Sequence, residues 1–157
     1  MTTVFALAAC AALALPQERG PDPQPDVGAL RAKIAELRDD VPEEVIAALA
    51  DTGTREAAEA LIAGYGDLAS IWMRREVVRA LARCDAAPEA AELALAKIAD
   101  VAVTETAPEL CLEAVDLLAA SPALGRPCLR RIVAAPAKAA VRERAMQRHV
   151  ETFAGGM

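Results

Sequence analysis

Residues 74–82, with the sequence RREVVRALA, decide the fold of this chain, together with residues 88–91 (PEAA) that follow shortly after. Met73, Val77 and Leu81 recur every four residues, so they share one face of a predicted helix. The proline that begins the second stretch can open a new helix, because the first helical position needs no backbone N–H donor. These residues therefore predict two successive helices joined by a short turn.

The same pattern of residues occurs more than once along the chain. Residues 56–63 (EAAEALIA) align with residues 89–96 (EAAELALA), and residues 75–82 (REVVRALA) align with residues 112–119 (LEAVDLLA). A weaker third copy spans residues 142–149. The two alignments have offsets of 33 and 37 residues. Offsets of this size between similar helix pairs are typical of proteins built from stacked helical repeats.

On these residues the chain resembles HEAT repeats, especially the short HEAT-like repeats of phycobilisome lyases. The resemblance covers roughly residues 41–153, and it departs from the family at residues 84–87 (CDAA), where a glycine and an aspartate usually join the two helices. It implies an all-α fold, a right-handed α-solenoid of about four antiparallel helix pairs. An ordinary globular helical bundle is the alternative fold.

Proline and glycine residues divide the chain into eight predicted helices. Each boundary uses a proline, where it costs least, or a glycine, and Thr54 can cap the third helix. The predicted helices cover residues 26–39, 42–53, 54–64, 70–84, 88–101 and 108–120, then a seventh that opens at Pro122 and an eighth that opens at Pro136 and runs to 153.

The composition favours an all-helical protein and restricts its chemistry. The 157 residues suit one domain, and a chain that is 55% hydrophobic is too apolar to be disordered. The 39 alanines favour helices, while only 3% of the residues are aromatic, which argues against a β-sandwich or barrel. With one histidine and no glycine-rich phosphate loop, we expect a protein that is not an enzyme.

The first fifteen residues predict an export signal. Residues 4–15 (VFALAACAALAL) form an apolar run that is too short to cross a bilayer, which takes about 20 helical residues. Residues 12–14 (ALA) fit the small-x-small pattern that a signal peptidase cleaves. We therefore expect a signal peptide at residues 1–15, a Pro-rich linker at 16–25 and a periplasmic or secreted repeat domain at 26–157.

Two alternatives to simple cleavage remain for this segment. Residues 7–10 (LAAC) resemble the lipobox of bacterial lipoproteins, in which a lipid on Cys10 would anchor the protein to a membrane. The other alternative is a buried N-terminal helix in a cytosolic protein. Contact with a membrane is expected only through the signal or such a lipid anchor.

The sequence predicts no catalytic residues, no metal site and no cofactor. A zinc site needs four close ligands, usually in two pairs. No C-x-x-C pair occurs among Cys84, Cys111 and Cys128, and His149 is distant from them in sequence. A nucleophilic cysteine paired with His149 would lack an orienting third group. Disulfide pairing among the three cysteines stays open.

The candidate binding residues are charged side chains that recur every three or four residues and so share one face of a predicted helix. Arg75, Arg79 and Arg83 lie four residues apart on one predicted helix face, and the eighth predicted helix repeats that spacing. In HEAT-like proteins the second helix of each pair commonly lines the concave face. The resemblance then implies one binding face lined by Arg75, Arg79, Arg83, Glu113, Asp116, Arg144 and Arg148. Solvated helix faces with local ion pairs are the alternative interpretation.

Two functions follow from this pattern. The first is a non-enzymatic scaffold module whose face, lined by the second helix of each pair, binds another protein or a peptide. The second is nucleic-acid binding along the same arginines, although a net charge of −6 and a single tryptophan and tyrosine argue against it. A chromophore lyase or chaperone has only the fold-level analogy behind it. Self-association through the C-terminal end is a further expectation.

Overall fold

The computed structural model describes residues 25–84, 87–121 and 124–153, and within them the chain is helical, with no strand. The all-α prediction is therefore confirmed. The described helices are α1 (Val27–Leu37), η1 (Arg38–Asp40, a 3-10 turn), α2 (Glu43–Thr52), α3 (Arg55–Asp67), α4 (Ile71–Ala82), α5 (Pro88–Thr104), α6 (Pro108–Ala119), α7 (Gly125–Ala134) and α8 (Ala139–Phe153).

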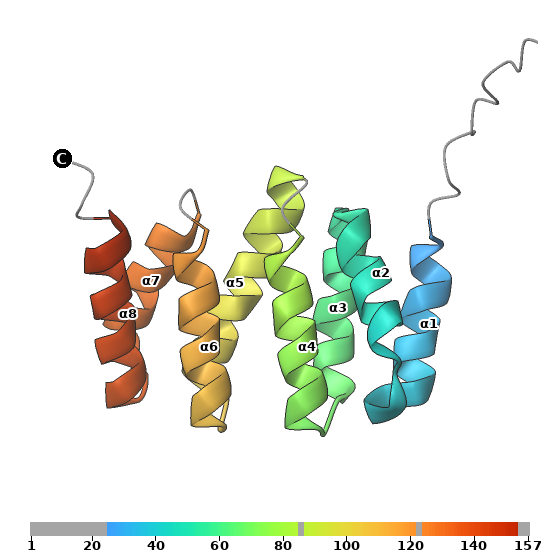
Figure 1. Ribbon diagram of the computed structural model, residues 1–157, viewed down its shortest axis with the longest axis horizontal. Coiled ribbons are helices and arrows are strands. Elements are labelled where there is room, and N and C mark those ends of the chain that lie inside the picture. Colours follow the sequence, from blue (N-terminus) through green and yellow to red (C-terminus); the bar gives the residue numbers. More distant parts are fainter. Residues whose placement is uncertain (1–24, 85–86, 122–123, 154–157) are drawn as a thin grey trace, which may run out of the picture.

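The helices form two layers (Figure 1). Helices α1, α3, α5 and α7 pack side by side in the odd layer, and α2, α4, α6 and α8 pack side by side in the even layer. Each helix also contacts the helix before it and the helix after it in the chain. The two layers consequently share an apolar interface that runs from α1 at one end to α8 at the other.

Several helix boundaries are set by capping residues, of which the sequence predicted Thr54 and Gly53. The side chain of Asp26 accepts hydrogen bonds from the first turn of α1, Thr54 Oγ1 accepts from Ala57 N, and Ser70 Oγ accepts from Met73 N. Gly53 ends α2 in the left-handed conformation, at φ 61°. These predicted boundaries are confirmed.

Other boundaries differ from the prediction by a few residues. Helix α3 continues through Gly64 and Gly66 instead of ending there, α5 runs on to Thr104, and α4 stops at Ala82. Gly64 is a packing residue, since a Cβ atom there would lie 2.5 Å from Ile34 Cγ2 of α1. The sequence could not distinguish a glycine that ends a helix from one that lets two helices approach.

The seventh and eighth helices begin three residues later than predicted. Pro122 lies outside the described residues, and α7 begins at Gly125, where a Cβ atom would lie 1.8 Å from the carbonyl oxygen of Leu118. Pro136 lies in the turn before α8, whose first helical hydrogen bonds include Arg142 N to Lys138 O. The start of α7 is therefore placed by its close approach to the end of α6.

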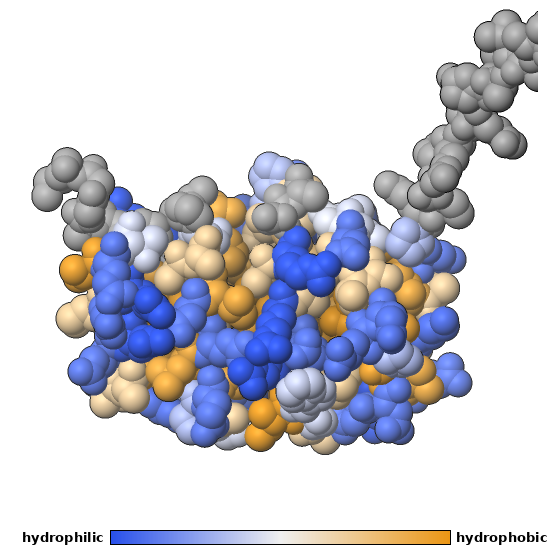
Figure 2. Space-filling view, in the orientation of Figure 1, coloured by the Kyte–Doolittle hydropathy of each residue, from blue (hydrophilic) through white to orange (hydrophobic). Residues whose placement is uncertain are grey.

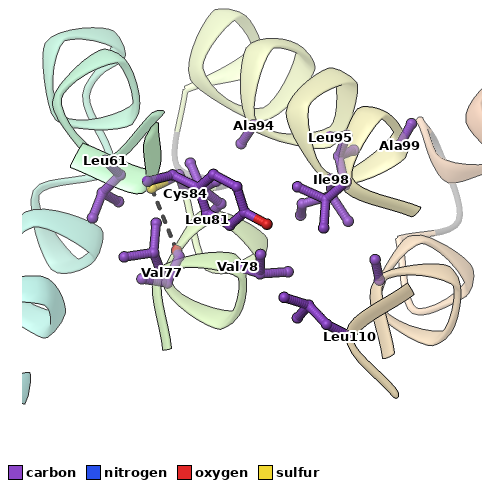
Figure 3. Packing of buried hydrophobic residues seen from close by; sticks show 14 of the residues in the cluster. Leu61, Val77, Val78, Leu81, Cys84, Ala94, Leu95, Ile98, Ala99 and Leu110 are labelled. Carbon is purple, nitrogen blue, oxygen red and sulfur yellow. Dashed lines mark hydrogen bonds between the residues drawn. The ribbon is translucent and has the colours of Figure 1, made fainter. Parts of the chain in front are cut away.

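The core lies between the two layers and consists mainly of alanine, leucine, valine and isoleucine side chains. Figure 3 shows Val78 of α4, Ile98 of α5 and Leu110 of α6 pointing into the same space. The apolar spacing predicts core positions for both Leu81 and Leu117, and Leu81 is indeed only 1% exposed. Leu117, which shares the apolar face of its helix, is only partly buried and lines a groove instead.

The predicted signal peptide, Cys10 and the linker up to residue 24 lie outside the described residues. Among the helices that the structure describes, none has the length and apolar character needed to span a bilayer.

Candidate functional site

The structure places six of the seven predicted binding residues on neighbouring helices of the even layer, and the seventh, Arg83, directly after α4. We call this set the charged face; it consists of Arg75 and Arg79 on α4, Arg83 at the C-terminal end of α4, Glu113 and Asp116 on α6, and Arg144 and Arg148 on α8. Figure 2 shows hydrophilic side chains gathered over α4 and over α8, with hydrophobic surface between them. The helical spacing, together with the resemblance to HEAT repeats, therefore pointed to residues that lie on or next to three neighbouring helices of one layer.

Glu113 of α6 connects its helix to α4. Its Oε1 atom accepts a hydrogen bond of 2.6 Å from Arg79 Nε, and its other carboxylate oxygen forms an ion pair with Arg75. Arg79 also donates to Glu76 Oε1 at 2.9 Å within α4. The hydrogen bond to Glu113 is the main reason why the pKa of Arg79 is raised.

Asp116 makes the corresponding connection between α6 and α8. Its two oxygens accept from Arg144 Nε at 3.0 Å and Arg144 Nη2 at 2.9 Å, and Oδ1 also accepts from Arg148 Nε at 2.7 Å. Burial alone would raise the pKa of Asp116, but the hydrogen bonds from both arginines lower it. Asp116 therefore stays ionised and holds the last helix of the array against α6.

The arginines of the charged face each contact at least one carboxylate. Arg83 forms an exposed ion pair with Asp51 of α2, and Arg148 donates to Glu151 at 3.0 Å. Asp51, Glu76 and Glu151 were not among the predicted residues. Glu76 and Glu151 could have been found, because each lies three residues from its arginine on the same helix; nothing local in the sequence indicates Asp51.

A groove of about 470 Å³ opens beside the charged face, between α4, the first half of α5 and the end of α6. We call it the α4–α6 groove. Leu81, Leu95 and Leu117 supply its larger apolar side chains. Its described lining residues are Arg79, Leu81, Ala82, Arg83, Cys84, Ala91, Leu95, Leu117, Ala120 and Ser121.

Sequence reasoning missed a buried carboxylate at the turn between α5 and α6. Glu105 is 8% exposed, and its Oε2 atom accepts from the Tyr65 hydroxyl at 2.6 Å and from Arg74 Nη1 at 3.1 Å. Its Oε1 atom accepts from the backbone N–H of Thr106 at 2.7 Å. Burial alone would raise the pKa of Glu105, but these hydrogen bonds and the nearby guanidinium lower it to about 2.

Cations surround the same cluster on two sides. Lys97 Nζ lies 4.9 Å from the centre of the Tyr65 ring, and Lys138 Nζ donates to the carbonyl oxygens of Glu105 and Thr106 at 3.0 and 2.8 Å. Burial raises the pKa of the Tyr65 hydroxyl, so it remains a donor. Because the polar atoms are satisfied by one another, the cluster ties α3, α4, α5 and α8 together and has a structural role. The lone tyrosine of the sequence was its only local signal.

The cysteines of the described residues show the environment of core side chains. Cys111 is fully buried, with Sγ 3.3 Å from the carbonyl oxygen of Glu105, and burial raises the pKa of both the Cys111 and the Cys128 thiols. No disulfide joins Cys111 to Cys128. Within the described parts of the chain, no three His, Cys, Asp or Glu side chains lie close enough to hold a metal ion.

We compared the chain with known protein families, proteins and structures. No protein-family model, curated protein or solved structure matches the chain. Function must therefore be argued from the charged face and the α4–α6 groove themselves.

Proposed function

We propose that this chain is a non-enzymatic binding module, an exported HEAT-like right-handed α-solenoid of about four antiparallel helix pairs, whose even layer binds another protein or a peptide. The packing of every second helix side by side supports the repeat architecture, because stacked repeats contact mainly their neighbours. The apolar run at residues 4–15 supports export.

The observation that carries the binding function is the arrangement of the even layer. Helices α4, α6 and α8 present arginines and carboxylates that bridge from helix to helix, and a groove with apolar lining opens beside them. Trp72, 54% exposed, precedes Arg75 and Arg79 by three and seven residues and so lies along the same stripe of α4. Tryptophan and arginine are the residues most enriched at the energetic centres of protein interfaces.

Pairing of the arginines favours a protein partner over a nucleic acid. Phosphate binding needs cations whose counterions can be released, whereas Arg75, Arg79 and Arg144 already contact carboxylates of this chain. With a net charge of −6, the chain as a whole also repels a polyanion. Nucleic-acid binding therefore remains the second candidate.

A peptide selection tests the proposed function. Peptides selected from a random displayed library on the whole chain should bind the wild type and lose about tenfold or more in affinity for the double variant Arg79→Glu/Arg144→Glu. The matched control is Arg31→Glu/Arg131→Glu, which makes the same charge change at exposed positions of α1 and α7 in the odd layer. Selected peptides whose affinity falls only in the control variant would contradict the proposal.

A short DNA duplex tests the alternative on the same proteins. At about 50 mM salt, where phosphate contacts are strongest, we expect no binding to the wild type. Salt-sensitive DNA binding that disappears in the Arg79→Glu/Arg144→Glu variant would favour the nucleic-acid function instead.

The mass of the recovered protein in each cell fraction tests export. We expect a product outside the cytoplasm that lacks the first fourteen or so residues. Loss of nine residues with added lipid mass would instead show a lipoprotein anchored at Cys10. A full-length cytosolic product would overturn the export proposal.

A further inference from the structure

We propose that the α4–α6 groove is a binding site for an acidic peptide, which inserts a bulky apolar side chain between α4 and α6 and places a neighbouring carboxylate on Arg83 and Arg79. This inference rests on the proposed function and names the chemistry of its partner. Of the charged face, only Arg79 and Arg83 line this groove.

The lining of the groove suits an apolar side chain. Leu81, Leu95 and Leu117 come from three different helices, and three alanines also line the groove. Leu117 remains partly exposed at this groove, although the next residue, Leu118, is fully buried. A volume of about 470 Å³ lies within the ~300–1,000 Å³ of small-ligand pockets.

The charge of the groove differs from that of the other grooves in the described structure. Among the described residues that line it there are two arginines and no carboxylate. The groove between α2 and α4 shares both arginines but also contains Glu43 and Glu76, and the grooves on α5 and α8 contain glutamates as well. The described lining of the α4–α6 groove therefore suits an acidic ligand better than the other linings do, because their glutamates oppose such a ligand.

Arg83 is the cation best placed to accept a new partner. Its ion pair with Asp51 joins side chains that are 55% and 63% exposed, and such exposed pairs contribute little to the stability of a fold. Exchanging Asp51 for a carboxylate of the ligand consequently costs little. Arg79, which donates to Glu113 at 2.6 Å and to Glu76 at 2.9 Å, is held in position at the edge of the groove and adds a second, weaker attraction for a carboxylate.

A peptide fits these features better than a polynucleotide does. An apolar floor has no counterpart on a phosphate backbone, and two arginines are few for phosphate recognition, which gains its affinity from many released counterions. A leucine or phenylalanine next to an aspartate or glutamate supplies both contacts within a few residues of extended chain.

The probes for this inference are labelled Gly/Ser peptides with the fixed core Leu-Glu-Phe-Asp, measured by fluorescence polarisation on the whole chain. Two control peptides replace either the acidic residues by lysine or the apolar residues by serine. We expect binding of the Leu-Glu-Phe-Asp peptide only, weakening as salt is raised. Equal binding of the lysine peptide, or no binding of the acidic peptide, would overturn the inference.

Matched variants locate the site. Arg83→Glu, which changes an exposed side chain, should weaken binding of the Leu-Glu-Phe-Asp peptide by about tenfold or more, and Leu117→Lys should do so by filling the groove. Arg131→Glu on α7 should leave it unchanged. If library-selected peptides bind through Arg144 and are unaffected by Arg83→Glu and Leu117→Lys, the proposed function stands and this inference fails. If no selected peptide binds, both fail.

Discussion

Glu105 shows how one buried carboxylate can join the turn between α5 and α6 to α3 and α4. Its oxygens accept hydrogen bonds from Tyr65, Arg74 and Thr106, so removing the charge leaves donors unsatisfied in a site that is 8% exposed. A buried donor without an acceptor costs about 1–3 kcal/mol. The stability of the protein should therefore depend more on Glu105 than on any exposed glutamate.

We predict that Glu105→Gln lowers the free energy of unfolding by about 1–3 kcal/mol near neutral pH. The folded-state pKa of Glu105, about 2, lies below its ordinary value of 4.5, so the ionised carboxylate stabilises the fold above pH 4.5 and this contribution is lost as the pH falls toward 2. Urea unfolding at several pH values should show that the difference in the free energy of unfolding between the variant and the wild type becomes smaller as the pH falls. Glu92→Gln, an exposed control, should show neither effect; a difference independent of pH would contradict the prediction.

Two leucines of similar sequence context should differ in their contribution to stability. Leu81→Ala removes a side chain that is 1% exposed and should cost about 2–5 kcal/mol, whereas Leu117→Ala removes one that is partly exposed at the groove and should cost about 1 kcal/mol. Denaturant unfolding of both variants measures the difference. Equal losses would mean that the groove beside Leu117 is closed in solution.

At the level of the helices, the glycines of α3 and α7 have separate roles. A Cβ atom at Gly64 would meet Ile34 of α1 at 2.5 Å, one at Gly125 would meet the Leu118 carbonyl oxygen at 1.8 Å, and one at Gly66 would meet nothing within 4 Å. Gly64 and Gly125 therefore set the distance between helices, whereas Gly66 only lowers the helix propensity of α3.

We predict opposite effects of alanine at these positions. Gly66→Ala should stabilise by up to about 1 kcal/mol, the difference in helix propensity, while Gly64→Ala and Gly125→Ala should destabilise by about 1–3 kcal/mol because the helices must move apart. Gly125→Ala should be the worse of the two, since a backbone oxygen cannot rotate away. Thermal unfolding of the three variants checks the order, and a stabilising Gly64→Ala would refute the close approach of α1 and α3.

The helices were predictable from the sequence wherever a boundary depended on local chemistry. Capping by Thr54 and Ser70 and the left-handed Gly53 follow from contacts within one turn of the chain. The extension of α3 past Gly64 was not predictable, because it depends on α1. The same holds for the polar side chains of the sites. The arginines spaced four residues apart can be recognised in the sequence, but Asp51 and Glu105 bind partners that lie 32 and 31 residues away in the chain.

On the scale of the whole molecule, each helix depends mainly on its neighbours. The odd and even layers connect α1 to α8 only through the helices between them, and Asp116 and Glu113 bridge one step of the even layer each. A stacked repeat array, as proposed for this chain, opens locally from its ends, whereas a bundle around a single core unfolds as one unit.

We predict that a cavity at one end of the array affects hydrogen exchange only near that end. Ile34, 2% exposed, packs α1 against α3, so Ile34→Ala should accelerate amide exchange in α1, α2 and α3 and leave α7 and α8 unchanged. The mirror experiment is Ile132→Ala in α7, which is also fully buried and should accelerate α7 and α8 alone. Mass-resolved exchange of both variants against the wild type provides the comparison. Equal acceleration of all helices in either variant would show a single cooperative core, and the repeat architecture proposed for this chain would then be wrong.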